Sequence, residues 1–207
     1  MKEYVTVAQK AQDDFFERKS QFIGAIAPVS TEEEALAFLS EVRAKHRDAR
    51  HNCFAYVLKN GVKRCSDDGE PQGTAGVPIL EVVEREGITD VIVVVTRYFG
   101  GILLGAGGLV RAYAHAAKLA VDAAQRKVMS PAVLLRLKMD YNQYGKINNI
   151  LSKYTAVLQN TEFTDMVTMG ILFIERDVEA FRAELTELTA ATVVPEEVER
   201  CMGEFPL

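Results

Sequence analysis

Residues 96–113 contain residue types that bind anions, in an order that leads from a strand into a helix. Glycines let a ligand approach the backbone closely, and the free N–H groups at the start of a helix attract negative charge. The segment lacks both the GxGxxG pattern and the GK[ST] ending of a Walker A loop, so a mononucleotide cradle is weakly supported, and a contact to a phosphate backbone is left open. The candidate ligand-binding residues are Arg97, Tyr98, Gly100, Gly101, Gly105, Gly107, Gly108 and Arg111.

This glycine-rich segment has two interpretations that remain open. Arg97 and Arg111 flank the glycines, and Tyr98 and Tyr113 could offer ring faces on which bases stack. In the alternative, the arginines are solvated at the surface and the glycines permit tight packing. We weigh the two equally, because two arginines, two tyrosines and a helix start coincide within eighteen residues.

Residues 66–76 form a polar segment with three carboxylates among glycines and hydroxyl groups. Carboxylate oxygens suit a hard cation such as Mg²⁺, and Asp67, Asp68 and Glu70 are the candidate ligands. The spacing does not match a calcium-binding EF-hand loop. The structural alternative is a turn in which Asp side chains accept hydrogen bonds from nearby N–H groups, with Thr74 capping the next helix. The residues expected to shape a cleft here are Ser66, Asp67, Asp68, Glu70, Gly73 and Thr74.

A zinc site is a further hypothesis, based on His51, Cys53 and Cys65. A fourth ligand and a CxxC pair are both missing from the sequence pattern, and Cys53 falls in an apolar strand. A buried free thiol is therefore the favoured interpretation of Cys53. The basic run 43–51 is interpreted as a solvated helix end, where cations suit the helix dipole.

Composition and charge limit the classes of function. The chain has 207 residues, a net charge of −5 and 48% hydrophobic residues, which is typical of a globular protein. Residues 1–129 contain 17 basic and 17 acidic residues, whereas residues 130–207 contain 7 and 12. A uniformly basic nucleic-acid coat is excluded, and any polyanion is expected to bind the N-terminal part.

The cysteine count and the first residues bear on the compartment. The chain has three cysteines, an odd number, and their spacing does not match a disulfide framework, which indicates a reducing environment. The start MKEYVTVAQKAQDDFF lacks the apolar core of a secretion signal, and no apolar run approaches the roughly 20 residues of a membrane span. We therefore expect a cytoplasmic protein that does not contact a membrane.

Hydrophobic periodicity predicts an α+β protein with two domains, residues 1–129 and 130–207, joined by a linker at 127–132 that contains Ser130-Pro131. In the first domain we expect two extended stretches within residues 1–28 and strands at 53–58 and 91–96. We also expect a helix that is capped by Thr31 or Ser30 and ends in the basic run 43–51, and helices at 78–86 and 108–126. The second domain is expected to contain strands at 133–140, 156–163, 166–175 and within 193–202, and helices at 143–154 and 178–188. This β-α-β-β-α-β order is typical of a ferredoxin-like fold.

Several motifs together resemble the IMPACT/YigZ family, in its two-domain bacterial form. They cover about residues 15–125 and include KSQFI at 19–23, HNCFAY at 51–56, SDDGEP at 66–71, GTAG at 73–76, VVTRYFGG at 94–101 and GGLVRAY at 107–113. The resemblance implies that the N-terminal domain has a βαβ fold similar to domain IV of elongation factor G and to a small-subunit ribosomal protein. It also implies that the ferredoxin-like domain is similar to domain V of that factor.

The resemblance implies function only in part. Eukaryotic IMPACT proteins restrain a starvation-response kinase by competing for its ribosome-associated activator, and we expect this chain to differ from them by lacking their additional N-terminal domain. The resemblance therefore implies a non-enzymatic regulatory protein linked to translation, with RNA, the ribosome or a ribosome-associated protein as partner.

Two other functions remain open on the residues alone. One is a Mg²⁺-dependent enzyme that acts on a phosphorylated small molecule or nucleotide, with the metal at Asp67, Asp68 or Glu70 and the phosphate at residues 105–108. The other is an adaptor that binds a partner protein without nucleic acid. The sequence implies no cofactor other than Mg²⁺, and it leaves the oligomeric state open.

Overall fold

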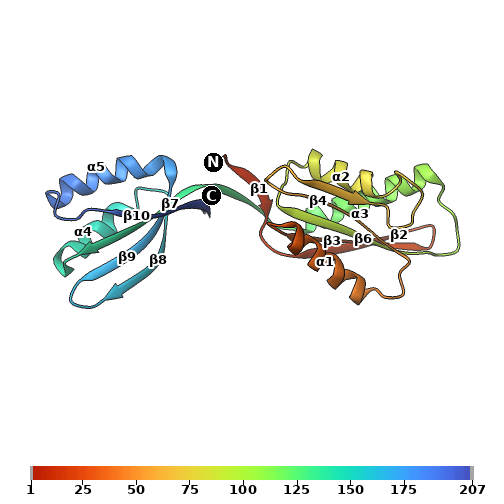
Figure 1. The fold of residues 1–207 in the computed structure, drawn as a ribbon, viewed down its shortest axis with the longest axis horizontal. Helices are drawn as coiled ribbons and strands as arrows, with labels where there is room; N and C mark the ends of the chain where they lie inside the picture. The colour runs from red at the N-terminus through yellow and green to blue at the C-terminus, as the bar shows by residue number, and fades with distance from the viewer. Residues whose placement is uncertain (1, 206–207) are drawn as a thin grey trace. The chain divides into compact units, whose positions relative to one another are not determined.

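A computed structural model describes residues 2–205 of the chain. The chain forms two compact units (Figure 1). The N-terminal unit is Val5–Lys127, and the C-terminal unit consists of residues 2–4 and 128–205. Both units combine sheets with helices, so the α+β prediction is confirmed.

The N-terminal unit is built on a five-stranded antiparallel sheet with the order β2-β3-β6-β4-β5. The strands are β2 (Ala11–Glu17), β3 (Ser20–Pro28), β4 (His51–Val57), β5 (Lys63–Ser66) and β6 (Val91–Tyr98). β6 lies at the centre and is buried from Val91 to Arg97, as the apolar run predicts. β5 was not predicted, because its residues Lys63–Ser66 are polar and lie at the edge of the sheet.

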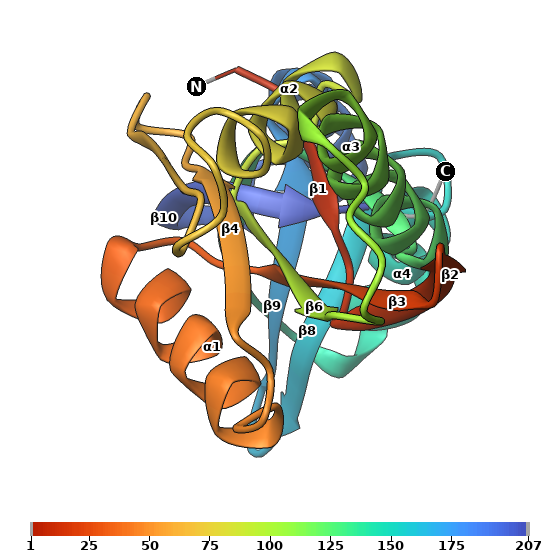
Figure 2. The same cartoon turned by 90° about the vertical axis from the view of Figure 1, so that its right-hand side faces the viewer.

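Helices cover both faces of this sheet (Figure 2). α2 (Gly76–Arg85) and α3 (Ala106–Ala123) pack on one face, whereas α1 (Glu32–Lys45) packs on the other. Thr31 caps α1 as predicted, because its hydroxyl accepts a hydrogen bond from Glu34 N at 3.2 Å. The alanine-rich face of α3 allows a close approach to β3, where a Cβ on Gly24 would lie 2.2 Å from the Ala116 carbonyl oxygen.

The register of the sheet brings two motif segments, residues 66–76 and 96–113, to one end of the N-terminal unit. This end faces the viewer in Figure 2. Arg97 lies opposite Phe22 on one side and His51 on the other. The β2–β3 turn, the start of β4 and the segment between β6 and α3 therefore meet at this end. The turn residues Arg18 and Lys19 have φ values of 46° and 65°, an arrangement that keeps the hairpin tight.

The C-terminal unit has the predicted ferredoxin-like order. Its elements are β7 (Arg126–Met139), α4 (Tyr141–Leu151), β8 (Ala156–Phe163), β9 (Val167–Ile174), the 3₁₀ turn Glu175–Asp177, α5 (Val178–Thr189) and β10 (Glu196–Glu204). The strands pair in the order β10-β7-β9-β8, all antiparallel, and β1 (Tyr4–Val7) also pairs with β7. Apolar residues of the strands and of both helices form one core.

The two units divide between Lys127 and Val128, within the predicted linker 127–132, but these residues lie in β7 and do not form a turn. Ser130 and Pro131 pair with Gly203 and Met202 of β10. Proline is tolerated here because β9 pairs with β7 only from Ala132 onward, so Pro131 lies where one ladder begins. Pairing with β10, which is distant in the sequence, therefore holds Ser130-Pro131 in a strand although this dipeptide favours a turn.

Candidate functional site

The segment between β5 and α2 is organised around the side chain of Asp67. Its Oδ1 accepts hydrogen bonds from the N–H groups of Ala75 and Gly76 at 3.0 and 2.8 Å, and its Oδ2 accepts one from Gly73 N at 2.8 Å. Burial raises the pKa of Asp67, but the hydrogen bonds from these three N–H groups together lower it by more, so the net shift is downward. Asp67 therefore caps α2, and both of its oxygens are in use.

Asp67 replaces the predicted cap Thr74. The N-cap residue of α2 is Ala75, and the Thr74 hydroxyl instead donates to the Pro71 carbonyl at 2.6 Å. Thr74 is buried, so it does not line an open cleft. A carboxylate from eight residues upstream thus performs the role assigned to the adjacent hydroxyl.

Asp68 is also engaged within the protein. One oxygen accepts from Arg43 Nη2 at 2.6 Å and the other from Asn52 N at 2.7 Å. Its own N–H donates to Ser66 Oγ at 3.1 Å. Within residues 2–205, no group of three or more His, Cys, Asp or Glu side chains is arranged to hold a metal ion. The polar loop thus fits its structural interpretation better than a Mg²⁺ site.

Glu70 joins the two motif segments through a buried ion pair. Its Oε1 accepts from Arg97 Nη1 and from the Tyr113 hydroxyl, both at 2.7 Å. The side chains of Arg97 and Glu70 are only 7% and 4% exposed. The guanidinium also lies 5.4 Å from the ring centres of Phe22 and Phe99.

The Arg97–Glu70 pair contradicts two predictions, that Arg97 binds a phosphate and that Tyr113 stacks on a base. Arg97 is neutralised and enclosed, so its guanidinium is not available to an external phosphate. Tyr113 is fully buried and cannot stack on a base. Burial is the main cause that raises the pKa of Tyr113, with Cys53 and Glu70 adding to the effect. The two motif segments do lie together, but they meet through a structural contact.

Cys53 belongs to the same buried cluster. Its thiol donates to the Asp67 carbonyl oxygen, and burial raises its pKa to about 12. Cys65 is exposed on β5, and all three cysteines are free thiols. His51 Nδ1 lies 2.9 Å from the Asp68 carbonyl oxygen. The structure supports the interpretation of Cys53 as a buried free thiol.

Tyr98 and the first two glycines of the motif stabilise the end of the sheet. Tyr98 is half-buried, and its hydroxyl lies 3.0 Å from His46 Nδ1. Gly100 is required because a Cβ there would lie 2.0 Å from the Lys19 carbonyl oxygen. Gly101 has a φ of 84°, and no other atom lies close to where its Cβ would be.

The start of α3 retains the properties expected of an anion site. Gly105 is the N-cap with a φ of 73°, and Gly107 and Gly108 follow in the first turn. Arg111 is exposed, and no ion pair of this side chain occurs in the described part of the chain. A cavity of about 230 Å³ lies beside it, lined by Phe15, Glu17, Arg18, Leu104, Gly108, Arg111, Ala112 and His115.

The β2–β3 turn is a component that sequence reasoning missed. Arg18 Nη1 donates to the Leu103 carbonyl at 3.4 Å, which holds the cationic turn against the segment that precedes α3. Phe16 and Phe99 are 67% and 52% exposed, so this region also presents aromatic surface, with the Arg97 guanidinium on one side of the Phe99 ring. The sequence did contain an indication of this cationic turn, since Arg18 and Lys19 are adjacent and lie between two extended stretches.

The fold and this site together define a two-domain α+β protein with a cationic, aromatic end on its N-terminal unit and a ferredoxin-like C-terminal unit. Residues 18–121 match the model of the Impact N-terminal domain, and residues 137–192 match a domain of unknown function, DUF1949. The chain belongs to the IMPACT family.

Similar proteins cover most of the chain. It is 39% identical to IMPACT family member YvyE of Bacillus subtilis, over 90% of this chain and 87% of that protein. It is 34% identical to IMPACT family member YigZ of Escherichia coli, over 85% and 88%. A solved structure titled as a hypothetical protein has a TM-score of 0.63 and 32% identity, with 96% of this chain and 98% of that chain covered. Among the described helices, none combines the length and apolar character that crossing a membrane requires.

Proposed function

We propose that this protein is a non-enzymatic regulatory protein of the IMPACT family that binds RNA, on the ribosome or in a ribosome-associated particle. The observation that carries the proposal is the exposed Arg111 in the second turn of α3, beside a cavity that Arg18 and Gly108 of the first turn also line. Two guanidinium groups and the free N–H groups of a helix start provide donors for one phosphate group. Glu17 at the same cavity offsets one of the two charges.

Exposed aromatic rings extend the proposed contact from phosphate to base. Phe16 lies near the end of β2, and Phe99 lies directly after β6. Single-stranded nucleic acid binds where aromatic faces lie beside a cationic surface, because every base can stack. Phe99 and Phe16 thus replace Tyr98 and Tyr113 as the proposed stacking residues.

The engaged carboxylates favour binding over the enzymatic alternative. Asp67 and Glu70 direct their oxygens at groups of the protein itself, and Asp68 is paired with Arg43. A regulatory binding role needs no metal at these positions. We place the protein in the cytoplasm, and its three free thiols support a reducing compartment.

Salt dependence of RNA binding tests the proposal. The full-length protein is titrated into a labelled single-stranded RNA at several salt concentrations, and the slope of log affinity against log salt is measured. Each lost phosphate contact reduces the slope by about 0.7. Arg111→Ala is expected to weaken binding and reduce the slope by about one contact, and Arg18→Ala is expected to do the same.

Arg85→Ala is the matched control, because Arg85 is an exposed arginine in the last turn of α2, away from the motif segments. It should leave both affinity and slope unchanged. A salt-independent affinity would contradict the proposal, as would equal effects of Arg111→Ala and Arg85→Ala. Capture of a protein partner from nuclease-treated lysate, without RNA binding, would favour the adaptor instead.

A further inference from the structure

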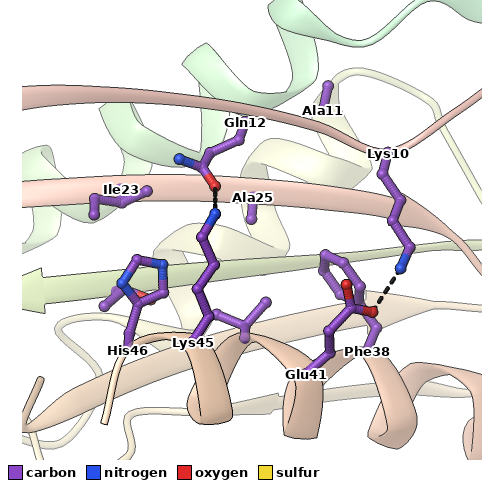
Figure 3. Close-up of a pocket in the computed structure, with 11 residues that line it drawn as sticks. Lys10, Ala11, Gln12, Ile23, Ala25, Phe38, Glu41, Lys45 and His46 are labelled. Carbon is purple, nitrogen blue, oxygen red and sulfur yellow. Dashed lines mark hydrogen bonds and ion pairs between the residues drawn. The ribbon is translucent and has the colours of Figure 1, made fainter. Parts of the chain in front are cut away.

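A second cavity of the N-terminal unit lies between α1 and the β2–β3 hairpin (Figure 3). Its volume is about 250 Å³. It is located on the face of the sheet that α1 covers, whereas the cavity beside Arg111 borders α3. The floor is apolar and consists of the buried side chains of Ile23, Ala25, Phe38 and Val42. An apolar floor of this kind favours a ligand with an apolar body.

One end of the rim has a charge pair that compensates itself. Lys10 Nζ lies 2.5 Å from Glu41 Oε2, and the same ammonium is 5.2 Å from the centre of the Phe38 ring. Figure 3 shows this pair above the phenyl group. Because each charge has a partner, this end adds no net charge to the cavity.

The other end of the rim has a cation without a carboxylate. Lys45 Nζ donates to Gln12 Oε1 at 2.9 Å, which is a neutral amide oxygen. No ion pair of Lys45 is found among residues 2–205. An ammonium group has three donors, so hydrogen bonds remain for a ligand, and the Gln12 side chain retains its own NH₂ donors.

His46 lies beside Lys45 and is held in place from the sheet. Its Nδ1 pairs with the Tyr98 hydroxyl at 3.0 Å, and the ring lines the cavity. Figure 3 shows the ring next to the Lys45 side chain. Burial, followed by the charge of Lys45, lowers the pKa of His46, which favours the neutral imidazole, so the ring adds no second positive charge. The positive charge at this end therefore belongs to Lys45.

We propose that this cavity binds a small monocarboxylate with a compact apolar body, either an aryl or a branched aliphatic acid. The carboxylate pairs with Lys45 and accepts from the Gln12 amide, while the body covers Ile23, Ala25 and Phe38. The size is suitable, because an apolar cavity of about 150 Å³ admits benzene, and this cavity offers room for a ring and a carboxylate. The site is separate from the proposed RNA surface and does not depend on it.

Nuclear magnetic resonance titration of the full-length protein tests this proposal with phenylacetate and 4-methylpentanoate as probes. Shifts are expected at Ala25, Phe38 and His46 as either acid is added. Phenylacetamide, the neutral analogue, is expected to bind at least about tenfold more weakly, because it lacks the charge that Lys45 pairs with. Lys45→Gln should weaken phenylacetate binding by a similar factor.

Lys63→Gln is the matched control, because Lys63 is an exposed lysine on β5, at the opposite edge of the same sheet. It should leave phenylacetate binding unchanged. The proposal is overturned if neither acid shifts the cavity residues at concentrations up to about 10 mM, the range of the weakest specific binding. Equal binding of the amide, or unchanged binding by the Lys45→Gln variant, would also overturn it.

Discussion

Glu70→Gln is expected to destabilise the N-terminal unit strongly, because Glu70 is the one carboxylate within residues 2–205 that pairs with the buried Arg97. The two side chains are 4% and 7% exposed and their charged atoms lie 2.7 Å apart. At an effective dielectric constant of about 20, unit charges about 4 Å apart attract by about 4 kcal/mol. Breaking a buried pair on one side costs about 3–5 kcal/mol, and we expect a loss in this range.

Native-state hydrogen exchange at the amides of β6 measures this loss, since the central strand exchanges only when the unit opens. Glu84→Gln is the matched control, because Glu84 pairs with Lys63 at 2.6 Å and these side chains are 42% and 48% exposed. The control should cost less than about 1 kcal/mol.

The double variant Glu70→Gln with Arg97→Met completes the test, since it removes both charges. It should be less destabilised than the sum of the single variants by about 2 kcal/mol or more. Strict additivity, or a Glu70→Gln loss no larger than that of Glu84→Gln, would refute the reasoning that the pair locks the two motif segments together.

Three further predictions concern the same unit. Asp67→Ala should cost about 1–2 kcal/mol in denaturant unfolding. Because the folded-state pKa of Asp67 lies below its ordinary value of 3.8, this difference should be full above that pH and shrink as acid protonates the folded carboxyl, and a pH-independent difference would contradict it. Iodoacetamide at pH 8 should label the exposed Cys65 and leave Cys53 unmodified in peptide mass spectra, whereas equal labelling would contradict the burial of Cys53. Gly24→Ala should reduce the free energy of unfolding by about 3 kcal/mol and so lower the melting temperature, because the new Cβ would meet the Ala116 carbonyl. An unchanged melting temperature would contradict this close contact.

Periodicity was sufficient to predict the C-terminal unit from the sequence. β7, β9, α4 and α5 each have an apolar face that packs in one core, so local pattern and final packing agree for these elements. The apolar run Val91–Val95 likewise belongs to a predicted strand, residues 91–96, and this strand is buried at the centre of the sheet. The extended conformation of residues 127–132 was not predicted because strand pairing, which joins residues about 70 positions apart, is not visible in the local turn residues.

The candidate site was only partly predictable for a physical reason. Sequence gives the residue types, but the partner of a charged side chain depends on the fold. Arg97 and Arg111 look equivalent in the sequence, yet Glu70 buries and neutralises the first, while the second remains exposed. Asp67 likewise has the composition of a metal ligand but serves as a helix cap, because the N–H groups of α2 point at it. Arg18 was missed because its role requires a hairpin that brings it to Leu103.

Mapping a bound RNA on the full-length protein tests the central claim most directly. In a nuclear magnetic resonance titration with a single-stranded oligonucleotide, the account predicts shifts concentrated at Arg18, the first turn of α3 and Phe99. Shifts confined to β5 or to the C-terminal unit would contradict the account, as would no shifts at low salt.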